Sequence, residues 1–357
     1  MTSVYVIAEA GVNHNGSEDL ARQLVDAAKA VGADAVKFQS FKPEALVSRH
    51  APKADYQQQT TGKDESQLRM LQKLALPEGV QQALKDYCGQ IGIDFLSSPF
   101  DLDSARWLLD GLGMDTIKLG SGEITNAPLL LEIARSGARL ILSTGMSRLG
   151  EVEEALGVLA YGYSGQTAPP SRRAFAAAWT EAEARAALRG KVSLLHCVTE
   201  YPSPPGQVNL RAMDALAAFG LPVGYSDHTP GIAVPIAAVA RGARIVEKHL
   251  TLDQNLPGPD HKASLAPAEF AAMVAGIREV EQALGDGVKV PAPCELRNAP
   301  VARKSLVAAR PLRLGEVFDA ANLTVKRPGS GRSPMDYWDV LGTAAGRDYG
   351  DDEVIDP

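Results

Sequence analysis

The segment Val4-Tyr5-Val6-Ile7-Ala8-Glu9 is the first of several short apolar runs that end in a reactive side chain, and this repeated pattern indicates the fold. The same arrangement recurs later in the chain, where Ile245-Val246 leads into Glu247, Lys248 and His249. Further runs of this kind lie between them, and nearly every one ends in a side chain able to do chemistry. Short apolar runs of this length are typical of buried parallel strands.

The polar groups that end these runs are the first candidates for a functional site. They are Glu9; Lys37 and Gln39; Ser97 and Ser98; Lys118, Ser121 and Glu123; Ser143; His196 and Tyr201; Ser226, Asp227 and His228; and Glu247, Lys248 and His249. Helical patterns alternate with the runs, for example after the N-cap candidate Ser17 and over residues 267–284. Eight strand–helix units predict a (β/α)8 TIM barrel, in which all these groups share the catalytic rim.

Changes in composition divide the chain into three parts. Residues 1–285 carry the barrel pattern, and the Gly- and Pro-containing residues 286–296 predict a semi-rigid linker. Residues 297–357 contain short β-like runs and predict a small β-rich domain whose core would be marginal alone. The fold class is therefore α/β, a TIM barrel followed by a small second domain. The polar residues 41–74 predict a long rim loop, and residues 161–173 predict an insertion.

The overall composition excludes some classes of function. A net charge of -7 argues against general nucleic-acid binding, which needs a basic face. No apolar stretch is long enough to span a bilayer, and the N-terminus lacks the pattern of a signal peptide. The three cysteines show no paired spacing, so we expect reduced thiols and a cytoplasmic protein.

Two histidines follow neighbouring strands of the predicted barrel, His228 after the seventh run and His249 after the eighth. Adjacent strands lie about 5 Å apart, so both imidazoles can reach one ion. Two histidines with oxygen ligands and open positions suit a divalent ion such as Mn²⁺, with Mg²⁺ or Co²⁺ as alternatives. The other interpretation is a pair of rim histidines that are hydrogen-bonded to carboxylates.

Cations and hydroxyl groups converge on the same predicted rim. The lysines are Lys37 and Lys118, and the hydroxyl groups belong to Ser98, Ser121, Ser143 and Ser226. Such a cluster binds a phosphate or a carboxylate, although either lysine alone is compatible with a structural ion pair. The carboxylates Glu9, Glu123, Glu247 and Asp260 can bind sugar hydroxyls or move protons, or form ion pairs with these lysines.

Several motifs, taken together and in order, closely resemble the sialic acid synthase family. In the barrel they are IAEAGVNHNG (7–16), AVKFQ (35–39), KLGSGE (118–123), LSTGM (142–146), GYSDHT (224–229) and GPDHKASL (258–265). In the tail they are RKSLVAA (303–309) and KRPG (326–329), which look like that family's C-terminal antifreeze-like (SAF) domain. The resemblance covers essentially the whole chain.

The resemblance implies a transferase that condenses phosphoenolpyruvate with an N-acylated mannosamine-type sugar, giving a nine-carbon nonulosonic acid and phosphate by C–O cleavage. By the family's pattern phosphoenolpyruvate would be held by Lys37, Ser98, Lys118, Ser121, Ser143 and Ser226. The metal would be held by His228 and His249, which with the proton-transfer candidates Glu9 and Glu123 form the catalytic set. The sugar would be contacted by Gln39, Tyr201, Glu247, Asp260 and Arg327.

The resemblance also implies a homodimer in which Arg327 reaches the neighbouring subunit's sugar from an exchanged SAF domain. The exact sugar stays open, because Thr199 stands where N-acetylneuraminate synthases often have Asn. N-acetylmannosamine and a 2,4-diacetamido-2,4,6-trideoxymannose are both candidates, the second leading to N,N'-diacetyllegionaminate. The competing functions are a Schiff-base aldolase using Lys37 or Lys118, and a non-catalytic sugar-binding protein.

Overall fold

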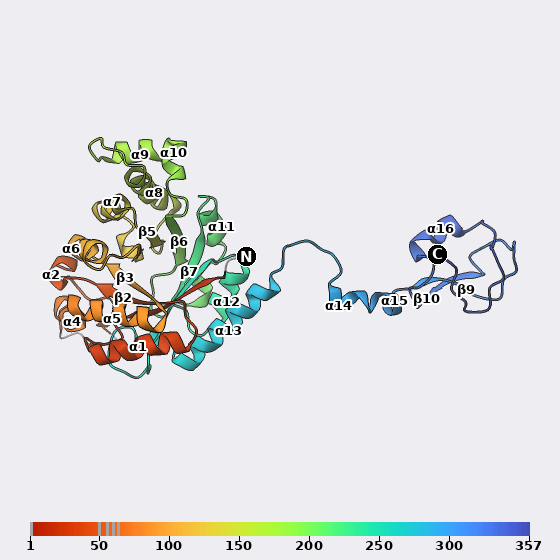
Figure 1. Cartoon of the computed structure of the whole chain (residues 1–357), viewed down its shortest axis with the longest axis horizontal. Helices are drawn as coiled ribbons and strands as arrows, with labels where there is room; N and C mark the ends of the chain where they lie inside the picture. The colour runs from red at the N-terminus through yellow and green to blue at the C-terminus, as the bar shows by residue number, and fades with distance from the viewer. Residues whose placement is uncertain (1–2, 49–50, 55–56, 59–60, 63–64) are drawn as a thin grey trace. The chain divides into compact units, whose positions relative to one another are not determined.

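The computed structural model describes residues 3–48, 51–54, 57–58, 61–62 and 65–357 (Figure 1). Packing contacts divide the chain into two compact units, Met1–Gly285 and Asp286–Pro357. The first unit contains the candidate site. The second unit begins at the residue that opens the expected linker, and it has its own small core.

Within the described part of the first unit, eight parallel strands form one sheet in the order β3-β2-β1-β8-β7-β6-β5-β4. The strands β3 and β4, at the two ends of that order, pack against each other and close the sheet into a barrel. Their bounds are β1 Tyr5–Gly11, β2 Ala35–Ser40, β3 Asp94–Pro99, β4 Thr116–Leu119, β5 Arg139–Ser143, β6 Val192–Cys197, β7 Val223–Asp227 and β8 Ile245–His249. The predicted TIM barrel is confirmed.

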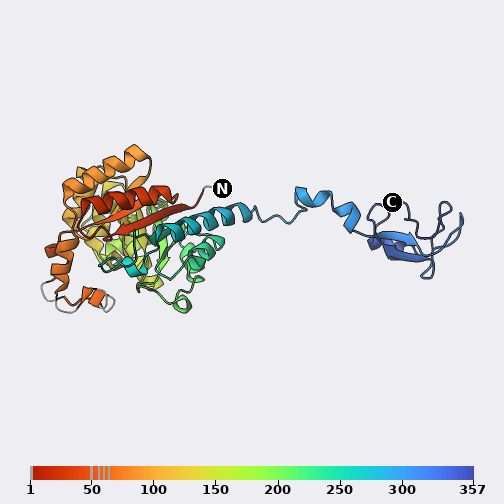
Figure 2. The same cartoon turned by 90° about the horizontal axis from the view of Figure 1, so that it is seen from below.

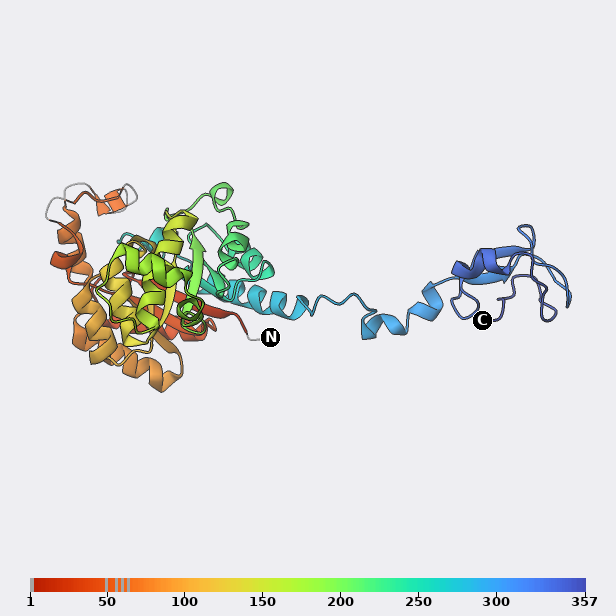
Figure 3. The same cartoon turned by 90° about the horizontal axis from the view of Figure 1, so that it is seen from above.

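Helices lie outside the strands, as the two turned views show (Figures 2 and 3). They are α1 Glu18–Ala30, α2 Pro43–Leu46, α4 Gln67–Leu74, α5 Glu78–Ile91, α6 Leu102–Arg106, α7 Ala127–Ser136, α8 Leu149–Tyr163, α9 Arg172–Thr180, α10 Ala182–Ala186, α11 Ala212–Ala217, α12 Ala233–Ala240 and α13 Pro267–Ala283. Short helical turns are η1 Trp107–Gly111, η2 Ser121–Glu123, η3 Pro205–Gln207 and η4 His261–Ala263. Ser17 caps α1 as predicted, because its side chain accepts a hydrogen bond from the Leu20 amide.

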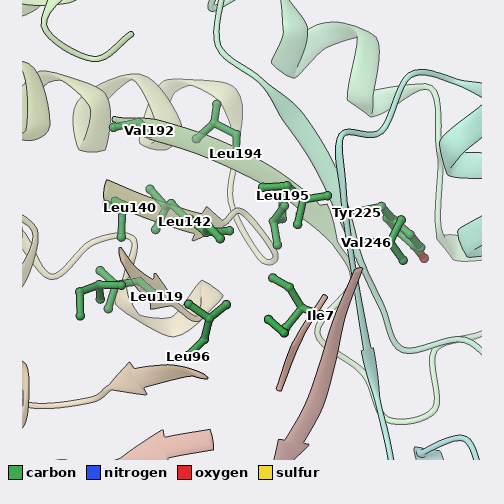
Figure 4. Close-up of a cluster of buried hydrophobic side chains, with 14 of the residues drawn as sticks. Ile7, Leu96, Leu119, Leu140, Leu142, Val192, Leu194, Leu195, Tyr225 and Val246 are labelled. Atoms are coloured by element: carbon green, nitrogen blue, oxygen red, sulfur yellow. The ribbon is translucent and has the colours of Figure 1, made fainter. Parts of the chain in front are cut away.

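The core has one layer inside the barrel and another between the strands and the helices. Ile7, Leu96 and Leu195 face one another inside the barrel, whereas Tyr225 and Val246 point away from them (Figure 4). This arrangement follows from the period of two along each strand, which sends successive side chains to opposite faces. The same alternation decides which of the strand-end polar groups enter the site.

The structure differs from prediction in both irregular stretches. The prediction of a single long loop over residues 41–74 is wrong in part, because α2 and α4 lie within it. Met70, Leu71 and Leu74 of α4 pack with Val12 and other apolar side chains into a separate small cluster, which stabilises helical structure there. The expected insertion at residues 161–173 begins inside α8, where Tyr161 is fully buried.

The second unit contains a two-stranded antiparallel sheet and short helices. Its elements are α14 Pro293–Leu296, α15 Ala299–Ala302, β9 Ser305–Ala308, β10 Leu323–Lys326, η5 Pro334–Asp336 and α16 Tyr337–Val340. Leu306, Phe318 and Tyr349 belong to its buried cluster. The helix α14 lies within the expected linker, where a proline at its first position starts a single helical turn.

Candidate active site

A cavity of about 360 Å³ opens at the carboxyl ends of the barrel strands. It is lined by every barrel residue to which the family resemblance assigns a role, namely Glu9, Lys37, Gln39, Ser98, Lys118, Ser121, Glu123, Ser143, Tyr201, Ser226, His228, Glu247, His249 and Asp260. These residues come from all eight strands or from the segments that follow them. The structure thus brings them together, while their individual roles remain predictions.

Some strand-end groups that were predicted on the catalytic rim lie elsewhere. In β8, Glu247 and His249 line the cavity, whereas Lys248 between them forms a buried ion pair with Asp227. Ser97 bonds Ser40 on the outer side of the strands, and His196 lines a neighbouring cavity. The expectation of one shared rim was therefore wrong for these four residues, because strand alternation sends every second side chain outward.

Two lysines and two carboxylates form a buried network at the floor of the cavity. The Lys37 ammonium lies 2.5 Å from Glu9 Oε2 and 3.2 Å from the Ser98 hydroxyl. The Lys118 ammonium lies 3.2 Å from Glu247 Oε1, which also accepts a hydrogen bond of 2.8 Å from Ser226. Each cation is thus paired with a carboxylate, and a serine hydroxyl group contacts one member of each pair, an arrangement that suits the binding of an anionic ligand.

Burial and neighbouring charges set the protonation of this network. Burial would raise the pKa of Glu247, but the ammonium groups of Lys118 and Lys37 outweigh it and lower the pKa to about 2. Burial lowers the pKa of Lys118, and Glu247 only partly offsets that effect. Burial also raises the pKa of Glu9, and the neighbouring Lys37 ammonium only partly offsets this effect.

Hydroxyl groups on the β4–β6 side of the cavity complete an anion-binding surface. Ser121 Oγ accepts a hydrogen bond of 2.9 Å from the Gly145 amide. The hydroxyl groups of Ser143 and Thr199 are buried, and neither has a hydrogen-bond partner among the described residues. A Cβ atom at Gly145 would lie 2.3 Å from the Thr199 hydroxyl, so glycine keeps this corner open. Buried hydroxyl groups without partners are available to a ligand.

His228 and His249 face each other across the ends of β7 and β8, with 5.7 Å between their ring centres. The His228 Nδ1 donates a hydrogen bond of 2.6 Å to the Val198 carbonyl, which leaves Nε2 to act as an acceptor. The centre of the Tyr201 ring lies 4.1 Å from the centre of the His228 ring. His249 Nδ1 is buried without a hydrogen-bond partner among the described residues.

This histidine pair fits a divalent metal ion. Burial lowers the pKa of both imidazoles, and that of His249 falls well below its usual value. Neutral imidazoles with a free nitrogen are the form that binds metal. Within residues 3–357, apart from the gaps given above, no group of three or more His, Cys, Asp or Glu side chains is arranged to hold an ion. The two imidazoles could supply two ligands and leave other positions open for substrate or water.

The remaining polar residues line the same cavity. Gln39 donates to Glu9 Oε1 at 3.3 Å, and Glu123 accepts a hydrogen bond of 2.7 Å from Asn126. Burial raises the pKa of Glu123. Burial, assisted by the charge of Glu9, raises the pKa of Asp260 to about 7. Asp260 is thus poised to exchange a proton near neutral pH.

The raised pKa of Asp260 predicts a measurable effect on stability. The folded state binds this proton more tightly than the unfolded state, so the contribution of Asp260 falls as pH rises from about 4 to about 7. Between pH 5 and pH 8 wild type should lose about 3 kcal/mol of unfolding free energy relative to Asp260→Asn. Urea unfolding at both pH values measures this difference. Parallel pH dependence in the two proteins would contradict it.

An apolar wall of the same cavity was not predicted from the sequence. Its residues, which come from α2, α4 and the segments after β1, β2 and β3, are Val12, Leu46, Val47, Met70, Leu71, Leu74 and Phe100. The helical spacing of Met70, Leu71 and Leu74 was a usable signal, but the polar residues around it favoured a loop. The cavity therefore has a charged floor and an apolar side.

Arg327 lies in the second unit, directly after β10, and its side chain is exposed. It makes no ion pair or hydrogen bond with any residue that the structure describes. The placement of Arg327 relative to the cavity therefore remains a prediction.

The chain is thus an α/β-barrel protein with a second, small β-containing unit. The carboxyl end of its barrel carries a site with two lysines and two histidines. Residues 24–289 match the NeuB family, and residues 303–357 match the SAF domain. The chain belongs to the NeuB family, and the expected C-terminal SAF domain is confirmed.

Named relatives span nearly the whole chain. The chain is 48% identical over 356 residues to the N,N'-diacetyllegionaminic acid synthase of Campylobacter jejuni, covering 99% of each protein. It is 42% identical to the protein of the same name from Legionella pneumophila, covering 95% of this chain and 89% of that one. The crystal structure of an N-acetylneuraminic acid synthetase from Leptospira borgpetersenii matches with a TM-score of 0.67 at 30% identity, covering 83% of this chain and 90% of that one.

Proposed function

We propose that this protein condenses phosphoenolpyruvate with an N-acylated amino sugar and releases phosphate, giving a nonulosonic acid. The proposal rests mainly on one observation: the same cavity is lined by Lys37, Lys118, His228 and His249. The names of the similar synthases support the same reaction. The chemistry makes the protein a transferase.

The lysines and hydroxyl groups would hold phosphoenolpyruvate. Lys118 and Lys37 neutralise its phosphate and carboxylate, and Ser98, Ser121, Ser143 and Ser226 donate hydrogen bonds to their oxygens. These lysines and serines lie on the barrel strands or directly after them. They would therefore keep phosphoenolpyruvate in one orientation. The resulting electrostatic stabilisation applies to the phosphate as it leaves.

His228 and His249 would hold a divalent ion, Mn²⁺ in our proposal, which supplies Lewis-acid polarisation of the sugar's aldehyde oxygen when it is bound. The C3 carbon of phosphoenolpyruvate attacks the aldehyde carbon, and a C–C bond forms. Water adds to C2, and the tetrahedral product loses phosphate by breaking its C2–O bond. Glu9 and Glu123 would take the proton from water and supply one to the new hydroxyl group.

The apolar wall favours the trideoxy sugar over N-acetylmannosamine. A 2,4-diacetamido-2,4,6-trideoxymannose carries methyl groups at C6 and on two acyl groups, whereas N-acetylmannosamine presents hydroxyl groups at C4 and C6. Apolar side chains such as Met70, Leu71 and Leu74 accept methyl groups without leaving a polar group unpaired. We therefore propose that the product is an N,N'-diacetyllegionaminic acid. Gln39, Tyr201, Glu247 and Asp260 would contact its polar groups.

We further propose a homodimer in which the SAF domain of one subunit covers the site of the other. The exposed Arg327 would then bind the acyl oxygen of the sugar. Arg327→Ala should raise the KM for the sugar by about tenfold to a hundredfold, because one charged hydrogen bond is lost. The KM for phosphoenolpyruvate should change less than twofold, as steady-state kinetics can measure. Equal changes in both constants would contradict the proposal.

A cytoplasmic location is part of the proposal. The three cysteines are not joined in disulfides, as in proteins of a reducing compartment. In the described part of the chain, no helix is long and apolar enough to cross a membrane.

The decisive experiment follows phosphate release with phosphoenolpyruvate and a panel of sugars. The trideoxy sugar should exceed N-acetylmannosamine in kcat/KM by about tenfold to a hundredfold. EDTA should abolish phosphate release, and Mn²⁺ should restore it. Activity that persists in EDTA, together with a covalent enzyme–substrate adduct after borohydride reduction, would instead indicate a Schiff-base aldolase. Phosphate release without a sugar would also overturn the proposal.

A further inference from the structure

A fully buried ion pair lies directly behind the two histidines. The Lys248 ammonium is 2.5 Å from Asp227 Oδ2, and neither side chain has any exposed surface. The two residues are direct neighbours across the β7–β8 ladder, one position before His228 and His249 respectively. Their side chains leave the strands on the opposite face from Ser226 and Glu247, which line the cavity. The pair therefore joins the two strand ends that carry the imidazoles.

The Asp227 carboxylate also shapes the segment that contains His228. Its Oδ1 accepts hydrogen bonds from the Thr229 amide at 3.0 Å, the Thr229 hydroxyl at 2.9 Å and the Tyr225 hydroxyl at 2.9 Å. Lys248 also donates to the Thr229 carbonyl. The hydrogen bond to the residue two positions later forms a turn with His228 at its centre. The backbone of His228 is thus held from both sides.

A buried ion pair is weak evidence for a contribution to stability, because the desolvation of both charges offsets their attraction. An apolar pair of similar size would close the space between β7 and β8 equally well. What an apolar pair lacks is directionality, since it cannot specify the turn at His228 or the relative position of two strand ends. Because the charged pair lies behind the histidines, we expect it to orient these two residues rather than to stabilise the fold.

We infer that Asp227 and Lys248 are positioning residues that hold the His228 and His249 imidazoles at the separation needed to bind one divalent ion. The inference rests on the proposed function, because it requires that these two histidines are the metal ligands. Neither Asp227 nor Lys248 lines the cavity among the described residues, so both act through the histidines. Groups that orient metal ligands typically change metal affinity by 10–100-fold when removed.

The test is calorimetric titration of the metal-free full-length protein with Mn²⁺ alone. The double variant Asp227→Asn/Lys248→Met removes both charges together and keeps an acceptor for the Thr229 amide. We expect its Mn²⁺ affinity to fall by about 10–100-fold. Excess Mn²⁺ should restore most of kcat. Tyr225→Phe, which removes one hydrogen bond from Asp227 and keeps the ring, should weaken Mn²⁺ binding in the same direction and less strongly.

The matched control is Asp34→Asn/Arg278→Met, which removes another ion pair of the same unit, 2.9 Å between its charged groups, away from the cavity. This control should bind Mn²⁺ as wild type does, even if its thermal midpoint falls. A further variant, His249→Ala, distinguishes a failure of the proposed metal site from a failure of the positioning inference. If it binds Mn²⁺ like wild type, the proposed metal site is wrong. If it loses binding while the Asp227/Lys248 and Tyr225→Phe variants keep wild-type affinity within twofold, only the positioning inference is overturned.

Discussion

Replacement of His249 by alanine is expected to reduce kcat by roughly a thousandfold, which corresponds to about 4 kcal/mol of lost transition-state stabilisation. The imidazole is buried at the end of β8, and burial keeps it neutral and able to bind a metal ion. With His228 as the remaining protein ligand, the ion would be held too weakly to polarise the aldehyde. Phosphate release at saturating substrates measures the loss.

His196→Ala is the matched control for His249→Ala. His196 lies in β6, lines a neighbouring cavity, and its Nε2 bonds the Val208 carbonyl at 2.7 Å. We expect less than a tenfold change in kcat, because this ring lies outside the candidate active site. Retained activity in His249→Ala at low Mn²⁺, with an unchanged EDTA response, would refute the role of His249 as a ligand.

The second large effect is expected from Lys118→Met, which should reduce kcat/KM for phosphoenolpyruvate by about a hundredfold to a thousandfold. The substitution removes a buried cation and leaves Glu247 with the more distant Lys37 ammonium, 3.8 Å away. Negative charge would then oppose the phosphate and carboxylate of the substrate. Initial rates over a range of phosphoenolpyruvate concentrations measure the effect.

Two further variants test whether Lys118 binds phosphoenolpyruvate through its charge or forms a Schiff base with the substrate. Lys42→Met removes an exposed lysine that pairs with Asp103, and it should leave kcat/KM nearly unchanged. Lys118→Arg keeps the positive charge but cannot form a Schiff base. Partial activity in this variant is expected for phosphoenolpyruvate binding. Complete inactivity together with borohydride trapping in wild type would favour the aldolase.

Much of the fold could be predicted because its signals are local. The apolar run ending at His249 and the cap at Ser17 each appear at the expected position. The repetition of strand and helix patterns was enough to indicate a closed parallel barrel. The residues 41–74 were harder to interpret, because α4 is short and its apolar stripe packs on side chains from distant segments. Local polarity therefore favoured a loop where tertiary packing stabilises a helix.

The candidate site was predictable in its composition but not in its orientation. Residues at parallel strand ends meet at one edge, so the repeated strand pattern was sufficient to group Lys37, Lys118 and His249. Whether Lys248 or its neighbours face inward could not be decided from the run itself. A strand has two faces, and the choice depends on the partners across the barrel and on the helices outside.

The barrel, the second domain and the polar groups near the carboxyl end of the barrel were all predictable from the sequence, since these features follow from short-range periodicity and from motifs. Two features could be found only in the folded structure: Asp227 and Lys248 form an ion pair behind the histidines, and α2 and α4 give the cavity an apolar side. The physical reason is that burial, pKa shifts and ion pairing depend on atoms far apart in the chain, which come within a few ångströms only when the barrel closes.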